Sequence, residues 1–431
     1  MKKGFNFLLA TLCATGVLVG ATSCGTPAPE GSINLLTFTD ELSNMINNYY
    51  LKAHPEDEGK IKVEKSELNT MAQTLSQKMN NNGKGLPTMV ALEAAVVLNF
   101  IEPEYKQYLE PLNDIVDTGS TNNMYSYTKD IVTDEDGKVY GLAWQATPGG
   151  FFYKTKAAKK VGINSPEEMQ QKISTWEGFM DLAKECEEQQ IKVVSSITEP
   201  VKVFLSSRET SWVEDNKLMI DDCLYKDEYN CMDIMHELQQ NNYTSRSNER
   251  SAQWRNDISN ESVLGYFSSS WGLYYDLEEY AGSTAGEWAM CKGPHSFYSG
   301  GTWLSITSTA TPEQKALAKK IITYFTTDEA FLTEWGKETG DFMNNKNVMS
   351  SLKENYTCEF LGGQNHLETL YSVAEEISGD LISPYDNKIN STFKTWAGNY
   401  AMETSAAETK QDAIDVFKLK VANQYPTLIV E

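Results

Sequence analysis

The 431-residue sequence predicts an α/β protein of two lobes, each a mostly parallel β-sheet flanked by helices, with a hinge between the lobes. Three observations support this prediction. About 400 residues follow an apolar N-terminal segment, which is too long a chain for one hydrophobic core. Strand-like and helix-like apolar patterns alternate in the first hundred residues. The composition, 40% hydrophobic and 23% charged residues, is that of an ordinary globular chain.

Residues 1–23 have the features of a secretory signal peptide. Two lysines precede the apolar stretch 5–19, and small residues precede Cys24, in a pattern that resembles the lipobox of bacterial lipoproteins. We therefore expect Cys24 to carry acyl chains that hold the protein at a membrane surface. Residues 24–32, rich in Pro and Gly, then form an extended tether. The alternative is an ordinary signal peptide with an incidental cysteine.

The first predicted lobe opens with alternating strands and helices. Residues 33–38 fit a buried strand, 40–51 an amphipathic helix, 60–65 a second strand, 67–79 a second helix, and 88–98 a third apolar segment. This order is typical of parallel strands that are connected by crossover helices.

Turn and capping patterns locate the later elements. The Asp-Gly pair at 136–137 predicts a tight hairpin turn between 131–133 and 138–142. Three capping boxes predict helix starts, and they begin at Ser165, Ser174 and Thr311. A long helical tail is predicted from about residue 367 to 424.

Charge and cysteine content exclude some classes of partner and fold. The formal charge is −23, from 60 acidic and 37 basic residues, so binding to nucleic acid is not expected. The cysteines beyond Cys24 are odd in number and lack a C-x-x-C pair, which argues against a disulfide framework. They are Cys186, Cys223, Cys231, Cys291 and Cys358. We expect buried thiols, although Cys223 and Cys231 could close a small loop.

Catalytic and metal-binding motifs are absent from the sequence. It has no G-x-S-x-G nucleophile elbow, no phosphate-binding loop, no dinucleotide fingerprint and no H-E-x-x-H. Its four histidines are isolated, and the acidic turn at 134–137 lacks the remaining ligands of a calcium loop. We therefore predict a protein that is not an enzyme and that uses no metal or cofactor.

Aromatic residues are the notable chemical feature. The chain has nine tryptophans and 22 tyrosines, and several tryptophans have Gly, Ser, Thr, Gln or Asp around them. The candidates for ligand contact are Trp144, Trp212, Trp271, Trp303 and Trp396. Indole faces beside carboxylates and amides suit a sugar, whose C–H faces stack while its hydroxyls need hydrogen bonds. For each tryptophan, the alternative is a position in the core.

Several segments together resemble a known family. They are Asp-Gly-Lys-Val-Tyr-Gly-Leu-Ala-Trp at 136–144, Phe-Tyr-Lys-Thr-Lys at 152–156, Thr-Trp-Glu-Gly-Phe at 175–179, the stretch 265–271 that ends in Trp271, and Gly-Gly-Thr-Trp-Leu-Ser-Ile at 300–306. On these motifs the chain resembles the family 1 extracellular solute-binding proteins, the maltodextrin-binding type that feeds ABC importers. Ala143 replaces the proline that is usual in the first motif.

The resemblance implies a two-lobed periplasmic-binding-protein-like fold. One lobe would comprise residues 33–145 and 298–343, and the other residues 146–297 and 344–431. It also implies a monomeric lipoprotein on the outer face of a bacterial membrane, in the periplasm or at the extracellular surface. The protein would capture a sugar or short oligosaccharide between its lobes and deliver it to the permease subunits of an ABC transporter.

Carboxylates that follow predicted strands are the polar candidates for the site. Asp40 and Glu41 follow the first strand, and Glu93 follows the third if that strand ends near Leu92. Open α/β sheets bind ligands beyond the carboxyl ends of their strands. We expect all three to accept hydrogen bonds from sugar hydroxyls. The alternative for Asp40 is a helix N-cap.

Three other functions fit parts of the sequence. A surface-anchored glycoside hydrolase would share the anchor and the aromatic residues, but it needs two carboxylates across a scissile bond. A solute-binding protein for a peptide or polyamine would fit the acidic excess. An adhesion or assembly lipoprotein would bind no small molecule.

Overall fold

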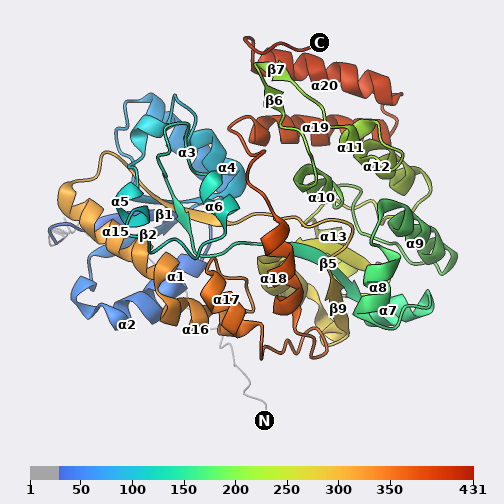
Figure 1. Ribbon diagram of the computed structural model, residues 1–431, viewed down its shortest axis with the longest axis horizontal. Coiled ribbons are helices and arrows are strands. Elements are labelled where there is room, and N and C mark those ends of the chain that lie inside the picture. Colours follow the sequence, from blue (N-terminus) through green and yellow to red (C-terminus); the bar gives the residue numbers. More distant parts are fainter. Residues whose placement is uncertain (1–28) are drawn as a thin grey trace, which may run out of the picture.

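The computed structural model describes residues 29–431, which form two bodies of helices and strands that lie side by side (Figure 1). The predicted signal peptide 1–23 and Cys24 lie outside the described residues. Within the described range, no helix combines the length and apolar character that crossing a membrane requires. The α/β architecture predicted from the sequence is confirmed.

The first body is built on a five-stranded sheet of order β2-β1-β3-β10-β4. Its strands are β1 (Ile33–Thr37), β2 (Ile61–Lys65), β3 (Met89–Glu93), β4 (Leu142–Ala143) and β10 (Thr302–Ile306). β1 pairs in parallel with β2 and β3, while β10 runs antiparallel between β3 and β4. The alternation predicted for the first hundred residues is therefore present, although the third apolar segment divides into β3 and a helix that follows it directly.

The second body contains a three-stranded sheet of order β8-β5-β9. Its strands are β5 (Gly149–Lys154), β8 (Gly265–Ser269) and β9 (Trp288–Cys291), and a short ribbon, β6 (Val213–Glu214) with β7 (Lys217–Leu218), lies apart from it. Both neighbours of β5 pair with it antiparallel, which differs from the mostly parallel sheet predicted for this lobe. No single crossover helix joins adjacent strands here, so nothing requires parallel pairing.

Helices cover both sheets. The α-helices are α1 (Glu41–Met45), α2 (Leu51–Ala53), α3 (Leu68–Asn80), α4 (Ala94–Phe100), α5 (Asn113–Val116), α6 (Ser126–Asp130), α7 (Thr155–Lys160), α8 (Pro166–Lys172), α9 (Trp176–Glu188), α10 (Val201–Ser206), α11 (Asp222–Tyr225), α12 (Cys231–Gln240), α13 (Ala252–Ile258), α14 (Ser270–Gly272), α15 (Pro312–Thr327), α16 (Glu329–Thr339), α17 (Lys346–Leu352), α18 (His366–Glu376), α19 (Asp386–Ala401) and α20 (Lys410–Gln424). π-helical turns span Ile46–Tyr50 and Leu273–Glu278. 3₁₀ segments span Pro55–Asp57, Lys106–Tyr108 and Gly282–Thr284.

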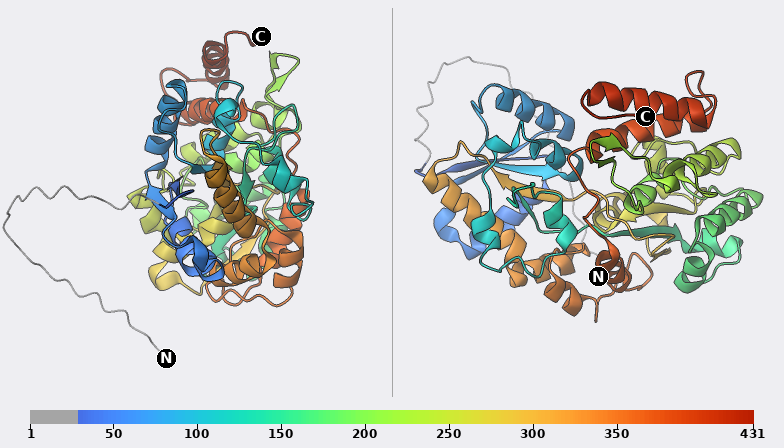
Figure 2. Two further views of the ribbon diagram at one scale, coloured as in Figure 1. Left: turned by 90° about the vertical axis from the view of Figure 1, so that its left-hand side faces the viewer. Right: turned by 45° about the horizontal axis from the view of Figure 1, so that its top comes forward.

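The predicted helical tail is divided into α18, α19 and α20. Figure 2 shows the last two, in red, packed on the second body, where α19 contacts both α12 and α20. Of the predicted helix starts, Thr311 forms a complete capping box with Gln314, and Ser165 accepts a hydrogen bond from the Glu168 amide. The start predicted at Ser174 lies one residue later, since the extended backbone of Thr175 brings its hydroxyl to the Gly178 amide.

The hairpin predicted around 136–137 is present as a tight turn. Thr133 pairs antiparallel with Val139, and Gly137 adopts a φ of 74°, which a residue without a Cβ accepts readily. The Asp134 carboxylate stabilises the turn by accepting hydrogen bonds from the amides of Asp136 and Lys138. The five cysteines within residues 29–431 are all free.

There are two hydrophobic cores: one lies within the second body, and the other fills the first body and reaches one face of the second sheet. The second sheet separates them, because successive residues of a strand point to opposite faces. Phe151 and Tyr153 of β5 belong to the core of the second body, whereas Phe152 between them belongs to the core that extends into the first body.

Two chain segments, 144–148 and 292–301, pass between the sheets. The Ser299 amide donates to the Thr147 carbonyl (3.2 Å), and the amide of Gly149, directly after the first segment, donates to the Phe297 carbonyl (2.8 Å). Thr147 has a φ of 56°, which is rare for a β-branched residue. We call this pair of segments the crossing segments.

Candidate functional site

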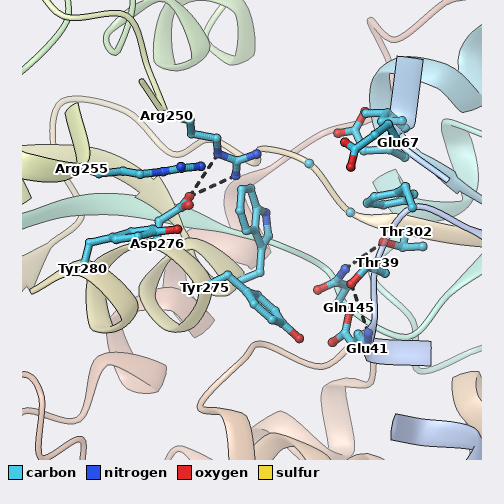
Figure 3. A pocket seen from close by; sticks show the side chains of 16 residues that line it. Thr39, Glu41, Glu67, Gln145, Arg250, Arg255, Tyr275, Asp276, Tyr280 and Thr302 are labelled. Atoms are coloured by element: carbon cyan, nitrogen blue, oxygen red, sulfur yellow. Dashed lines mark hydrogen bonds and ion pairs between the residues drawn. The ribbon is translucent and has the colours of Figure 1, made fainter. Parts of the chain in front are cut away.

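A cleft of about 510 Å³ lies where the two bodies meet at the crossing segments (Figure 3). It is lined by Phe38, Thr39, Glu41, Glu67, Leu68, Glu93, Gln145, Arg250, Arg255, Trp271, Tyr275, Asp276, Tyr280, Gly300, Gly301 and Thr302. Cavities of this size are typical of small-molecule sites. Both bodies contribute side chains, so closing or opening the cleft changes the contacts of any occupant.

The wall from the first body forms at the carboxyl ends of its parallel strands. β1 ends just before Thr39 and Glu41, and β3 ends at Glu93. The Thr39 hydroxyl accepts a hydrogen bond from the Glu41 amide at 3.2 Å, which fixes this turn. Gln145 follows β4 and donates to the Thr302 hydroxyl at 3.4 Å. The edge of an open sheet where ligands usually bind is therefore lined here by carboxyl, amide and hydroxyl groups.

The wall from the second body is carried by the helical segment that follows β8. Trp271 lies in α14, and Tyr275 and Asp276 lie in the π-helical turn after it. Arg250 reaches the same wall from the loop before α13 and donates from Nε and Nη2 to one carboxylate oxygen of Asp276, at 3.2 and 3.0 Å. Its guanidinium also lies 4.5 Å from the centre of the Trp271 ring.

Trp271 is held in place on two edges. Its indole nitrogen donates to the Ser299 carbonyl at 2.8 Å. Gly300 has a φ of 73°, and a Cβ at this position would stand 2.8 Å from the same nitrogen. The crossing segment therefore packs against the ring edge only because residue 300 is glycine. Trp271 and the Arg250 guanidinium on its ring both line the cleft.

Glu41 is a buried carboxyl with an unusual proton affinity. Burial raises the pKa of Glu41 to about 8, and the nearby Asp341 carboxyl adds to the rise. The Tyr275 phenol and the indoles of Trp335 and Trp144 face the carboxyl and oppose that rise. Neither indole nitrogen has a hydrogen-bond partner among the described residues, so the two N–H groups influence the Glu41 carboxyl from beyond hydrogen-bond distance.

Two further oxygens near this carboxyl lack hydrogen-bond partners within residues 29–431. Asp341 is buried, which raises its pKa to about 6, although the Ser270 hydroxyl and the Phe342 amide donate to its Oδ1 and oppose the rise. Its Oδ2 has no partner among the described residues. Gln145 Oε1 is also without a partner there, and Gln145 lines the cleft. Buried acceptors of this kind usually pair with water or with a ligand.

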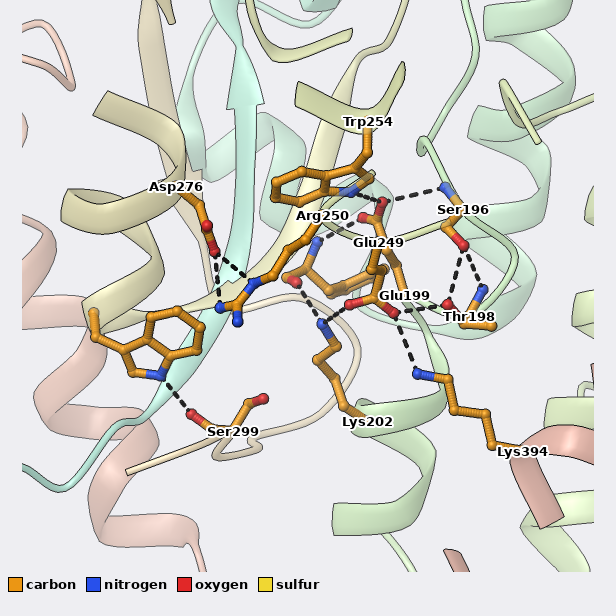
Figure 4. A network of polar contacts seen from close by, with 12 residues as sticks. Ser196, Thr198, Glu199, Lys202, Glu249, Arg250, Trp254, Asp276, Ser299 and Lys394 are labelled. Carbon is orange, nitrogen blue, oxygen red and sulfur yellow. Dashed lines mark hydrogen bonds and ion pairs between the residues drawn. The ribbon is translucent and has the colours of Figure 1, made fainter. Parts of the chain in front are cut away.

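A smaller compartment of about 240 Å³ adjoins the cleft beyond Arg250 and Trp271, and both residues line the two spaces. Figure 4 shows its polar network, in which the Glu249 carboxylate contacts the ammonium groups of Lys202 at 2.9 Å and Lys394 at 3.5 Å. Burial alone would raise the pKa of Glu249, but the two ammonium groups hold it well below its usual range.

A second buried glutamate stabilises the wall of this compartment. Glu199 accepts hydrogen bonds from the Ser196 amide at 3.2 Å, the Trp254 indole at 3.1 Å and the Phe267 amide at 3.3 Å (Figure 4). Burial raises the pKa of Glu199 to about 8, and the Glu249 carboxylate adds to the rise. This residue links the loop 196–199, helix α13 and strand β8.

Three of the predicted site residues line the cleft: Glu41, Glu93 and Trp271. Trp144 is fully buried behind Glu41 and acts on it without lining the cleft. Asp40 lies outside the cleft, where its exposed carboxylate pairs with Lys65. It occupies the N-cap position of α1, but its side chain accepts no capping hydrogen bond there.

The other three predicted tryptophans do not line the cleft. Trp303 is buried beneath Gly301 and donates to the Thr128 carbonyl at 2.7 Å. Trp212 lies in the core of the second body, where its indole donates to Asn390 at 2.6 Å. Trp396 on α19 packs against the same core. Polar neighbours in the sequence therefore do not separate a core tryptophan from one at a site.

Several lining residues were not predicted from the sequence. Tyr275 could have been found, because it follows Trp271 by four residues and so shares its side of a helix. Gln145 directly follows the Tyr-Gly-Leu-Ala-Trp motif. Arg250 and Arg255 come from a segment without any motif, and only the fold brings them to the cleft. Across residues 29–431, no group of three or more His, Cys, Asp or Glu side chains could hold a metal ion.

The family model for bacterial extracellular solute-binding proteins matches residues 48–355. No curated protein sequence matches the chain. Among solved structures, an extracellular solute-binding protein of family 1 is similar with a TM-score of 0.75 at 13% identity, over 90% of this chain and 99% of that one.

Two further solved structures contain sugars. The ABC transporter-associated binding protein of B. animalis subsp. lactis Bl-04, in complex with β-1,6-galactobiose, has a TM-score of 0.71 at 17% identity, over 91% of this chain and 97% of that one. Maltose-bound MalE3 of T. maritima has a TM-score of 0.70 at 15% identity, over 91% of this chain and 99% of that one. At these identities the likeness concerns the fold, and it confirms the two-lobed periplasmic-binding-protein-like architecture.

Proposed function

The chain belongs to the bacterial extracellular solute-binding proteins, and from that premise we propose that it captures a sugar or short oligosaccharide in the cleft and delivers it to an ABC transporter permease. We assign residues 33–145 and 298–343 to one lobe and residues 146–297 and 344–431 to the other. The crossing segments would then serve as the hinge.

The composition of the cleft carries this proposal. Aromatic rings from both bodies line it, namely Phe38, Trp271, Tyr275 and Tyr280, and they alternate with carboxyl, amide and hydroxyl groups. A sugar ring offers C–H faces to such rings and hydroxyls to such polar groups. Proteins of this fold that hold β-1,6-galactobiose and maltose support the same class of ligand.

Capture follows from contacts on both walls. A ligand that touches Glu41 on one wall and Trp271 on the other binds better when the lobes are close, so it shifts the population toward the closed arrangement. The aromatic faces contribute buried area, and the polar groups fix the orientation of the ring. The ligand leaves chemically unaltered, because transport requires release and not reaction.

The location of the protein is the second part of the proposal. We propose that Cys24 carries the lipid anchor, that residues 24–32 tether the lobes to the outer face of the membrane, and that the protein works as a monomer. Support comes from the sequence pattern before Cys24 and from a family whose members are extracellular.

Thermal unfolding of the mature protein with maltose, β-1,6-galactobiose, lacto-N-biose, tagatose and D-glucosamine tests the function. A ligand at one hundred times its Kd stabilises the folded state by about 2.7 kcal/mol, which raises the Tm by several degrees. Chromatography of the recovered sugar checks that it is intact, because release of smaller sugars would instead support a glycoside hydrolase. An unchanged Tm with every saccharide would contradict sugar capture.

A further inference from the structure

In one part of the cleft, several hydrogen-bond acceptors lie together and no Lys or Arg side chain that lines the cleft is paired with them. We call it the inner end, and it is formed by Glu41, Gln145 and Tyr275. Figure 3 shows the Glu41 carboxyl, the Gln145 amide and the Tyr275 phenol pointing toward one another, with the two arginines at the opposite end. Glu41 and Gln145 are only 8% and 5% exposed, so the fold holds both in place.

The Glu41 carboxyl of the inner end and the nearby Asp341 carboxyl have no basic partner within the described range. Neither Glu41 nor Asp341 makes an ion pair there with a Lys, Arg or His side chain. The arginines of the cleft are engaged elsewhere, since Arg250 pairs with Asp276 and Arg255 lies 4.9 Å from the centre of the Tyr280 ring. Two buried carboxyls near each other disfavour the ionised state of both.

A second observation points to an occupant. Gln145 Oε1 is buried, lines the cleft and has no hydrogen-bond partner in residues 29–431. One N–H of its amide donates to the Thr302 hydroxyl, and the oxygen is the acceptor that remains for a ligand. A free carbonyl oxygen beside a carboxyl calls for a donor, and a donor that also carries positive charge satisfies both groups.

We propose that the inner end receives a primary ammonium group, so that the captured sugar is an amino sugar. This inference rests on the proposed capture of carbohydrate. An ammonium group has three N–H donors, which match the Glu41 carboxylate, Gln145 Oε1 and the Tyr275 phenol oxygen. It also supplies the charge that the pair of Glu41 and Asp341 lacks, whereas a hydroxyl supplies one donor and no charge. An N-acetyl group would place a carbonyl oxygen against these acceptors.

The acidic first wall favours the same ligand. Glu41, Glu67 and Glu93 line it, and the basic residues that line the cleft, Arg250 and Arg255, both belong to the other wall. A cation on the ligand is therefore attracted to the first wall as it enters. A polyamine would present the same ammonium group without a sugar ring, so the experiment must separate these two sources.

Isothermal titration calorimetry on the full mature protein makes the separation. The probes are D-glucosamine, D-galactosamine and chitobiose with free amines, their N-acetylated and neutral hydroxyl counterparts, and putrescine and spermidine. We expect the amino sugars to bind at least tenfold more tightly than their counterparts. Glu41→Gln removes that preference, whereas Asp40→Asn removes an exposed carboxylate from the neighbouring position outside the cleft and keeps it.

A second variant guards against a folding defect in the first. Gln145→Met removes the free carbonyl oxygen without touching either carboxyl, and it also reduces the amine preference. Equal or tighter binding of neutral or N-acetylated sugars overturns the ammonium site while leaving sugar capture intact. If polyamines bind but no sugar does, the ammonium site is supported and the proposal that the ligand is a carbohydrate is overturned. Binding of none of these probes overturns the ammonium site, and sugar capture is then decided by the thermal unfolding with the other saccharides.

Discussion

Replacing Glu41 by glutamine is expected to make the protein more stable at alkaline pH. The pKa of Glu41 rises from 4.5 to about 8 because the carboxyl is buried beside Asp341. Each pKa unit corresponds to about 1.4 kcal/mol, so ionising this carboxyl in the folded protein costs about 5 kcal/mol more than in the unfolded chain. Glutamine keeps the shape of the side chain and cannot ionise.

The sign of this effect follows from linkage. Because the pKa of Glu41 is raised on folding, its contribution to stability is complete below pH 4.5 and is lost as the pH rises through about 8. The free energy of unfolding of Glu41→Gln, relative to the unchanged protein, should therefore increase by about 5 kcal/mol between pH 4.5 and pH 9. Glu199 has a similarly raised pKa, but it is present in both proteins and cancels in the difference.

Urea unfolding at intervals of half a pH unit, followed by circular dichroism, measures this difference. Asp40→Asn is the matched control, since Asp40 adjoins Glu41 in the sequence but its carboxylate is exposed. The reasoning would be refuted if the free energies of unfolding of Glu41→Gln and the unchanged protein differed by the same amount, within about 1 kcal/mol, at every pH from 4.5 to 9. It would mean that water reaches the Glu41 carboxyl in solution.

Three further outcomes are expected. Trp271→Ala should weaken sugar binding by about 1 to 3 kcal/mol in calorimetry, because it removes a large aromatic face from the cleft, whereas Trp396→Phe should leave the affinity unchanged. Gly300→Ala should weaken binding and lower the free energy of unfolding by about 1 to 2 kcal/mol, since its φ of 73° is left-handed and its Cβ would displace the Trp271 indole. Asp386→Ala should lower the free energy of unfolding by about 3 to 5 kcal/mol, because it leaves the buried Arg208 guanidinium, 2.6 Å from Asp386, without its partner.

Each of these outcomes has a result that would count against it. Equal sugar affinities of Trp271→Ala and the unchanged protein would remove this ring from the site. An unaltered affinity in Gly300→Ala would show that the indole tolerates displacement. For the buried ion pair, Lys226→Ala breaks the exposed pair with Asp222 and should hardly affect unfolding. Similar losses from both variants would show that burial of the pair does not matter.

The elements that could be predicted from the sequence are those set by local patterns. The first three strands and the helices between them follow from apolar periodicity, and Thr311 forms its capping box because both partners lie within one helical turn. The relative direction of the strands in the second sheet could not be predicted in this way. β5 is paired with strands more than a hundred residues later in the chain, and no local pattern records such partners.

The lining of the cleft was predictable only where it coincides with the end of a strand. Glu41 and Glu93 lie at the carboxyl ends of β1 and β3, so topology placed them correctly in the cleft. Asp40 is adjacent to Glu41, yet it points to solvent, since neighbouring residues at the start of a helix face different directions. Trp212 and Trp303 have polar neighbours in the sequence but apolar neighbours in space.

Stability and recognition at the inner end depend on the same desolvated carboxyl, so the two experiments on Glu41 constrain each other. If Glu41→Gln gains stability at high pH and loses the preference for amines, the folded protein tolerates a costly carboxyl because the ligand cation compensates it. If it gains stability but the preference is unchanged, the carboxyl is buried without meeting the ligand, and the ammonium site at the inner end is overturned. If stability does not change with pH, the carboxyl is solvated, and an ammonium group gains little there over a hydroxyl.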